Sequence, residues 1–396
     1  MSIMFQPVYI GPMGLKNRFV HSATHEVMAT DDGKVTDALT NRYKNLAKGE
    51  VGLIIPGHMY VHPLGQATYG QTSIHADEMI PGLKRLAAVV HENGGKICFQ
   101  LSHGGRQTPK AQIGAKPWAP SSQGRDPVSL NKARQMTEAM IEEVIEAFAA
   151  AAARAAEAGA DAVQVHAAHG YLVNEFLSPF FNKRKDRWGG SDENRFRFAA
   201  EIIRRIKSRL PDTMPVLVKM NTNDYTPAKG IEPKLAALYA KWLTQIGVDA
   251  IEVSCGTYYT FHGLRGDIPV AEMAAGLPAW MRPVAKVKLR FQKKDNTFVP
   301  AYNLAAAKRI KPEMGDIPLI LVGGMRKLAE MADVIERGHA DLISMSRPFI
   351  REPFLVKRFR EKKTAEAACI SCNKCFAAMF NDMPIKCYVD GLPGFK

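Results

Sequence analysis

The chain has 396 residues, of which 46% are hydrophobic and 23% are charged. This balance is typical of a folded protein with a sizeable buried core, and it excludes disorder as the main state of the chain. The 53 basic residues outnumber the 39 acidic ones, which leaves a formal charge of +14. Such a charge would suit nucleic acid, anionic ligands or a solvated basic surface, and only residues 286–294 and 357–363 are dense in cations. No stretch matches a nucleic-acid-binding signature, so we expect no nucleic-acid partner.

The N-terminal stretch MSIMFQPVYIGPMGLKNRF shows no targeting signal. It lacks a basic start followed by an apolar segment, and the chain has no run of about 18 apolar residues that could span a bilayer. We therefore expect a cytoplasmic protein, without a membrane partner, that forms a homo-oligomer.

Eight short apolar runs alternate with helical patterns, as is typical of βαβ units and a parallel sheet. No glycine-rich dinucleotide fingerprint follows the first run, so the pattern favours a (β/α)8 TIM barrel over a doubly wound sheet. We assign the barrel to residues 1–355 and a cysteine-rich C-terminal extension to residues 356–396. The predicted strands lie at residues 18–24, 51–57, 96–102, 162–168, 215–221, 250–256, 319–324 and 342–348.

Two helices have clear boundaries in the sequence. Apolar residues recur every four positions between residues 137 and 158, and Gly159 ends that pattern. Ser191 is a candidate N-cap because two acidic residues follow it. Two long connections, at residues 114–128 and 256–302, are expected to be loops that shape a binding site.

Polar residues cluster at the end of the fourth predicted strand, where a barrel of this kind carries its active site. His166, His169 and Tyr171 occur there within six residues. A single histidine would more often be structural, but two neutral imidazoles can donate to a substrate oxygen while a phenol supplies a proton. The cluster therefore indicates a catalytic site.

The stretch VQVHAAHGYLVNEFLSPFFNKRKDRWGGSDENRFRF closely resembles the Old Yellow Enzyme family of flavin-dependent reductases, as do FQLSHGGRQ and the closing LVGG and SMSRPFI. The resemblance covers roughly residues 1–355. It implies that FMN lies at the barrel mouth and passes a hydride to an activated carbon-carbon double bond of a small unsaturated carbonyl compound. His166 and His169 match the pair that holds the carbonyl oxygen, and Tyr171 matches the general acid. The chemistry agrees, because an enone accepts hydride only if its oxygen is stabilised and its α-carbon gains a proton.

The same resemblance implies contacts to the flavin ring. Gln100 matches the residue that hydrogen-bonds the pyrimidine, since an amide can both donate and accept. Ala23 and Thr24 match positions on the first strand against the flavin, where the hydroxyl could tune its redox potential. Lys219 stands where many relatives carry arginine, and lysine supplies the charge without a bidentate contact.

The FMN phosphate is expected after strands seven and eight, a position with its own physical warrant in barrels. Gly323 and Gly324 match backbone donors, and Ser346 and Arg347 match a backbone donor and a cation. The usual Gly-Arg pair is Ser-Arg here.

Four cysteines lie near the C-terminus in the pattern C-x2-C-x2-C-x11-C. In a reducing compartment such clustering favours a metal over disulfides, and zinc, an iron-sulfur cluster and free thiols all remain open. Longer family members, such as 2,4-dienoyl-CoA reductase and trimethylamine dehydrogenase, carry a 4Fe-4S cluster in a similar place. The resemblance thus implies this cluster here, although the middle spacer is one residue shorter than usual. The candidate ligands are Cys369, Cys372, Cys375 and Cys387.

Those longer relatives continue into domains for a second flavin and a nicotinamide cofactor, whereas this chain stops at Lys396. We expect electrons to arrive from a separate donor protein or directly from NAD(P)H. An ene-reductase is the leading hypothesis. An amine dehydrogenase is the alternative. The relative with that activity, trimethylamine dehydrogenase, attaches its flavin through a cysteine near the first strand, whereas here no cysteine precedes Cys98. A zinc-stapled binding module without activity is the second alternative. Cys98 and Cys255 are expected to be buried in strands.

Overall fold

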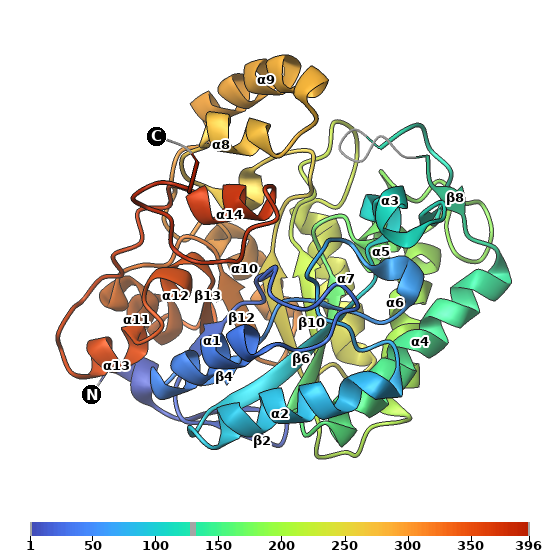
Figure 1. The fold of residues 1–396 in the computed structure, drawn as a ribbon. Helices are drawn as coiled ribbons and strands as arrows, with labels where there is room; N and C mark the ends of the chain where they lie inside the picture. The colour runs from blue at the N-terminus through green and yellow to red at the C-terminus, as the bar shows by residue number, and fades with distance from the viewer. Residues whose placement is uncertain (1, 127–131, 395–396) are drawn as a thin grey trace.

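The computed structural model describes residues 2–126 and 132–394. Its centre is a closed barrel of parallel strands, in which each strand pairs with its neighbour in the chain and the last pairs with the first (Figure 1). All eight predicted strands are confirmed, and so is the TIM barrel. The barrel strands are β3 (Phe19–His21), β4 (Leu53–Ile54), β6 (Lys96–Ser102), β9 (Ala162–Ala167), β10 (Val216–Asn221), β11 (Ala250–Ser254), β12 (Leu319–Val322) and β13 (Leu342–Met345).

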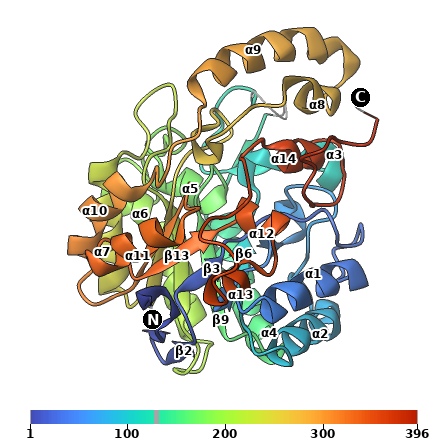
Figure 2. The ribbon, with the colours of Figure 1, turned by 90° about the vertical axis from the view of Figure 1, so that its left-hand side faces the viewer.

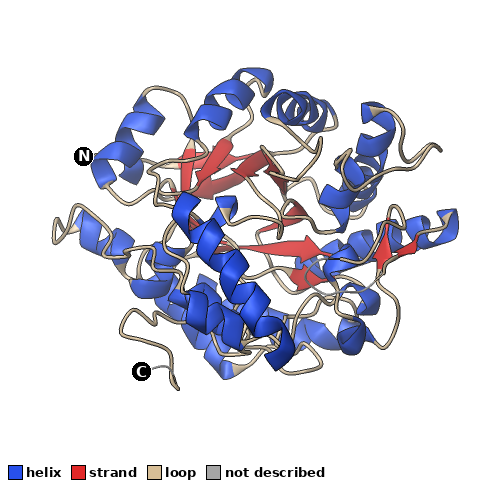
Figure 3. Cartoon of the chain, turned by 90° about the horizontal axis from the view of Figure 1, so that it is seen from above, coloured by secondary structure: helices blue, strands red, loops and turns tan. Residues whose placement is uncertain are grey.

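Helices surround these strands, as the view from above shows (Figure 3). They bury one apolar face against the sheet, as in the helix that begins after the N-cap Thr137 and buries Met140, Val144 and Phe148. The predicted N-cap Ser191 is also confirmed, because its side chain accepts from the backbone N–H of Asn194. The outer helices are α1 (Asp37–Lys48), α2 (Ile80–His91), α4 (Glu138–Glu157), α6 (Asp192–Lys207), α7 (Pro233–Gln245), α10 (Leu304–Ile310), α11 (Leu328–Glu336), α12 (Arg347–Arg351) and α13 (Leu355–Arg360).

An antiparallel hairpin closes the amino-terminal end of the barrel. Its strands are β1 (Val8–Ile10) and β2 (Met13–Leu15). Their apolar side chains pack against inward-facing residues of the barrel strands, including Cys98, which is fully buried as expected. The open mouth is therefore at the carboxyl ends of the strands. The apolar plug comprises Ile10, Met13, Leu15, Val20, Leu53, Ile55, Cys98, Ala162, Leu217, Ala250, Ile320 and Leu342.

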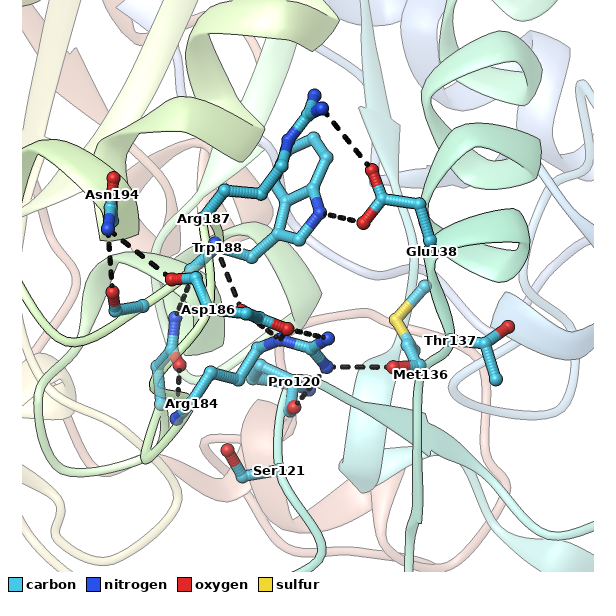
Figure 4. A network of polar contacts seen from close by, with 12 residues as sticks. Pro120, Ser121, Met136, Thr137, Glu138, Arg184, Asp186, Arg187, Trp188 and Asn194 are labelled. Carbon is cyan, nitrogen blue, oxygen red and sulfur yellow. Dashed lines mark hydrogen bonds and ion pairs between the residues drawn. The ribbon is translucent and has the colours of Figure 1, made fainter.

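The insertion predicted at residues 114–128 lies beside the barrel mouth, and its last two residues fall outside the described ranges. It is anchored by the loop that follows the fourth strand (Figure 4). Arg184 donates to the carbonyl oxygens of Pro120 at 2.9 Å and Met136 at 2.7 Å, and it pairs with Asp186. Short elements flank this region: β5 (Met59–Tyr60), α3 (Lys110–Ile113), β7 (Trp118–Ala119), β8 (Arg134–Gln135) and α5 (Leu172–Leu177).

The connection at residues 256–302 is not a plain loop. It contains α8 (Val270–Ala275) and α9 (Arg282–Asp295), and α9 is the outermost element at the top of the molecule (Figures 1 and 2). The C-terminal segment, with α14 (Lys374–Met379), packs against α8. The two segments share a small core of their own, formed by Ile268, Met273, Ala377, Ala378, Tyr388 and Leu392. Within the described residues, no helix is both long and apolar enough to cross a membrane.

Candidate active site

A cavity opens at the carboxyl ends of the barrel strands. His169 lines this cavity, together with six of the eight residues predicted to contact the flavin. These six are Ala23, Lys219, Gly323, Gly324, Ser346 and Arg347.

Two glycines at the end of β12 allow the chain to approach closely here. Gly323 and Gly324 have φ angles of 124° and 71°, which favour glycine. A Cβ on Gly323 would lie 2.7 Å from the Tyr302 ring, and one on Gly324 would lie 2.4 Å from the carbonyl oxygen of Val299. Any larger residue would therefore displace the segment that follows α9 from the cavity wall.

A buried polar chain crosses the barrel below the cavity. Gln100 donates from Nε2 to Oε1 of Gln164 at 2.6 Å, and Gln164 donates to Glu252 at 3.0 Å. Gln100 is buried in this row of hydrogen-bonded side chains and is not among the described residues that line the cavity. Thr24 is also outside the lining, and its hydroxyl lies 2.6 Å from that of Ser346.

Glu252 is the buried counter-ion of Lys219. Its Oε1 accepts from Lys219 Nζ at 3.2 Å, from Ser22 at 2.7 Å and from Ser344 at 2.9 Å. The sequence reasoning missed this residue. Its signal was a carboxylate in the middle of the otherwise apolar strand AIEVS, since a buried charge needs a partner.

The structure brings the three predicted catalytic side chains together. The ring of His166 lies 5.2 Å from that of His169 and 4.9 Å from that of Tyr171, measured between centroids. His169 has a positive φ of 63°, and its Nε2 lies 2.7 Å from the Ser254 hydroxyl. Burial lowers the pKa of His166 well below its usual value and that of His169 to about 3, so both imidazoles are neutral at pH 7.

His58, which the sequence reasoning missed, lies against the same cluster. Its ring centroid is 4.8 Å from that of Tyr171, and its Nε2 is 3.5 Å from the tyrosine Oη. Burial lowers the pKa of His58 well below its usual value and raises the pKa of Tyr171 to about 12. The contact therefore joins a neutral imidazole to a protonated phenol.

Two polar groups lie within hydrogen-bond distance of His58 Nδ1, the Gln71 amide at 3.1 Å and the Ser102 hydroxyl at 3.1 Å. Gln71 Oε1 accepts from the backbone N–H of Ala67 at 2.7 Å, which fixes the orientation of the amide. Its Nε2 therefore donates, to the carbonyl oxygen of His58 at 3.0 Å and to Nδ1 at 3.1 Å. In the tautomer that accepts from the Gln71 amide at Nδ1, the proton is on Nε2 and this N–H faces Tyr171.

The four predicted metal ligands line a second cavity, of about 310 Å³. Their segment is held to the barrel by Asn373, which donates to the carbonyl oxygens of Leu264 at 2.9 Å and Asp267 at 2.8 Å. Arg347 in turn donates to Oδ1 of Asn373 at 2.6 Å. Arg347 and Ser371 line both cavities, so this arginine lies between the cysteine segment and the barrel mouth.

The cysteines do not form a compact ligand set. Over residues 2–126 and 132–394, no group of three or more His, Cys, Asp or Glu side chains is placed to hold a metal ion. None of the four is in a disulfide, and burial raises the pKa of Cys375 to about 12. Cys255 is buried as expected, and its thiol points to the carbonyl oxygen of His262 at 3.7 Å.

Relatives of known activity share this fold over nearly the whole chain. The NADPH dehydrogenase of Bacillus subtilis (strain 168) is 35% identical over 368 residues, which cover 92% of this chain and 96% of that protein. A metal reductase of Desulforamulus reducens is 32% identical over 402 residues, which cover 100% of this chain and 54% of that protein. This chain thus spans about half the length of the second relative.

Solved structures agree. The complex of 2-naphthoyl-CoA reductase with 2-naphthoyl-CoA matches with a TM-score of 0.85 at 26% identity, over 98% of this chain and 56% of that one. An Old Yellow Enzyme homologue from Zymomonas mobilis matches with a TM-score of 0.74 at 24% identity, over 93% and 95% of the two chains. Residues 3–267 and 270–366 match the family model described as NADH:flavin oxidoreductase / NADH oxidase. The chain therefore belongs to this family, that of the Old Yellow Enzymes, and is a flavin-dependent oxidoreductase.

Proposed function

We propose that the protein is an FMN-dependent ene-reductase, which reduces the activated double bond of an enone, an enal or an enoyl thioester. The observation that carries this proposal is the cluster of His166, His169 and Tyr171 at the carboxyl end of β9, of which His169 lines the cavity. Neutral imidazoles stabilise the charge that develops on a carbonyl oxygen, and a protonated phenol delivers a proton to the neighbouring carbon.

The side chains around the larger cavity fit FMN. Lys219 offers a cation to the ring system, and Arg347 offers a second one near the end of β13, where barrels often bind phosphate. Gly323 and Gly324 leave backbone exposed to the cavity without side chains in the way. Bound FMN would supply the hydride chemistry. The roles of Gln100 and Thr24 stay predictions.

His58 would position the proton donor. In the tautomer that accepts from Gln71 at Nδ1, its Nε2–H faces the tyrosine oxygen, so that Tyr171 accepts from His58 and directs its own O–H elsewhere, toward bound substrate. After the proton has left, the same N–H stabilises the phenolate. This matters because burial makes the Tyr171 phenol a weaker acid, with a pKa of about 12.

We further propose that the four cysteines hold a 4Fe-4S cluster that feeds electrons to the flavin. Four thiols around one cavity are the expected donor set. Zinc, which four thiolates bind tetrahedrally with Zn–S bonds of about 2.3 Å, stays the alternative. A separate donor protein and NAD(P)H remain the two predicted electron sources.

The substrate of one structural relative supports an enoyl thioester. A structure at 26% identity is of 2-naphthoyl-CoA reductase with its thioester, which fits an enoyl thioester. A histamine dehydrogenase matches at 24% identity and shows the fold alone, and nothing in this site favours the amine dehydrogenase alternative. The binding module without activity is set aside, because the family is one of enzymes.

The decisive experiment separates the two half-reactions. The purified holoprotein is reduced with dithionite without oxygen and mixed with 2-cyclohexenone, while the flavin absorbance at 450 nm or so is followed. Rapid reoxidation and formation of cyclohexanone would support the proposal. The proposal would be refuted if 2-cyclohexenone left the flavin reduced and no saturated ketone formed, so that only oxygen reoxidised the flavin. Release of FMN into the supernatant on acid precipitation tests the cofactor.

A further inference from the structure

The outer face of α9 carries apolar side chains that nothing in the described chain covers. Val284, Val287 and Phe291 are 74%, 52% and 66% exposed, and they are spaced three and four residues apart, so they form one stripe. Trp280, in the turn before α9, is 73% exposed. We call these four residues the α9 stripe. The stripe is not the packing face of the helix, because Leu289, on the opposite side, contacts the small core near the C-terminus.

Cations border the α9 stripe. The helix carries six of them and a single acid, Asp295, which gives a net charge of +5. Lys288 and Lys294 follow Val284 and Phe291 by four and three residues and therefore lie beside the stripe. The cations are Arg282, Lys286, Lys288, Arg290, Lys293 and Lys294, and all are exposed.

Shape and charge select among possible partners. A second copy docked on the same stripe would oppose two helices of net charge +5, which is unfavourable. An acidic protein would need a groove shaped to the stripe, because α9 is a single outermost ridge (Figures 1 and 2). A lipid surface needs no such complementarity, since headgroups and acyl chains rearrange around apolar side chains.

We propose that the α9 stripe binds the surface of an anionic lipid bilayer. The helix has the required features: an apolar stripe that includes aromatic residues, a strongly basic polar border and low overall hydrophobicity. Val284, Val287 and Phe291 enter the headgroup region, while Lys288 and Lys294 extend to the lipid phosphates. The protein then lies on the membrane without crossing it. This inference does not rest on the proposed reductase activity.

Vesicle co-sedimentation of the full-length holoprotein tests this proposal. We expect binding to vesicles of phosphatidylcholine mixed with phosphatidylglycerol, weaker binding as salt rises, and little binding to phosphatidylcholine alone. The triple variant Trp280→Ser/Val284→Ser/Phe291→Ser should bind at least about tenfold more weakly. Tyr9→Ser is the matched control, because Tyr9 is 67% exposed on the hairpin at the other end of the barrel.

Two further measurements make the test specific. Lipids brominated on their acyl chains should quench the wild-type tryptophan fluorescence and should quench Trp280→Phe much less. Of the other three tryptophans, Trp118 and Trp188 are buried, and the half-buried Trp242 lies on α7, packed against the main core. Neutralising three stripe-border cations should weaken binding, and neutralising three exposed lysines of α1, α2 and α7 should not. The variant pair is Lys288→Gln/Arg290→Gln/Lys294→Gln and Lys48→Gln/Lys84→Gln/Lys234→Gln.

Several results would overturn the inference. One is a wild-type protein that binds no phosphatidylglycerol vesicles at low salt. Another is a stripe variant with bound flavin that binds vesicles as well as wild type does. A third is a wild-type dimer that the triple serine variant converts to monomer, because a second copy would then cover the stripe.

Discussion

Replacing His58 with phenylalanine tests the proposed route of the proton most directly. The ring shape stays, but the N–H that faces Tyr171 Oη at 3.5 Å is lost. The pKa of Tyr171 rises from 10.0 to about 12 on burial, so its ionisation is already about 2.7 kcal/mol harder than in water. A hydrogen bond to a charged oxygen is worth about 1.5–3 kcal/mol, which corresponds to roughly 10- to 150-fold in rate. We therefore expect His58→Phe to slow reoxidation of the reduced flavin by 2-cyclohexenone by roughly this factor.

The assay is anaerobic stopped-flow, in which flavin reduction and reoxidation are measured separately. Reduction should stay within about twofold of wild type, because it needs no proton from Tyr171. His58→Asn, which keeps an N–H donor, should recover part of the rate. His103→Phe is the control: His103 is another buried histidine, which stacks on Trp118. Unchanged reoxidation in His58→Phe, or equal losses in both half-reactions, would show that His58 does not position the proton donor.

Three other predictions concern the same site, the cysteine segment and the stability of the fold. Tyr171→Phe should slow reoxidation about 10²- to 10⁴-fold while flavin reduction stays nearly intact, and an unchanged oxidative rate would remove Tyr171 from the role of general acid. Protein purified without oxygen should contain about four iron and four sulfide per chain; Cys372→Ser should lose both and keep FMN, and stoichiometric zinc in place of iron would refute the cluster. Acid should destabilise the fold, because the pKa values of His21, His25 and His169 fall from 6.5 in the unfolded chain to about 3, 4 and 3 on burial. Below pH 6.5 the unfolded chain binds more protons than the folded chain. The free energy of unfolding should therefore drop by about 1.4 kcal/mol per histidine for each pH unit as the pH falls from 6.5 toward 4. Urea unfolding at pH 7, 6 and 5 measures this, and a midpoint that does not fall would contradict the burial of neutral histidines.

The sequence predicted those features that depend on the pattern of neighbouring residues. The eight strands and the helix after Thr137 follow from periodicity over neighbouring residues, and His166, His169 and Tyr171 were found because all three lie at or just after the end of one strand. The sequence did not identify His58 as a site residue, because His58 follows a different strand and contacts Tyr171 only once the barrel has closed.

Other misses have a similar physical cause. Residues 256–302 were expected to be a loop, yet α9 forms there. Its apolar residues recur at helical spacing on two opposite sides, one packed and one exposed, so the usual single apolar stripe of a surface helix is absent from the sequence. Glu252 was missed because its partner Lys219 lies on the neighbouring strand, and only the register of β10 and β11 pairs these two positions.

Because Arg347 borders both cavities, binding in the barrel mouth should be coupled to the order of the cysteine segment. This side chain borders both cavities and donates to Asn373, while Ser371 accepts a hydrogen bond from Arg326. Any ligand that orders Arg347 from the barrel side therefore also favours the ordered form of the cysteine segment, and the reverse holds by the same free energy. FMN should consequently protect residues 369–387 from proteolysis, and disruption of that segment should raise the dissociation constant of FMN without abolishing its binding. Such coupling would let the chain adjust its affinity for flavin to the state of its four C-terminal cysteines.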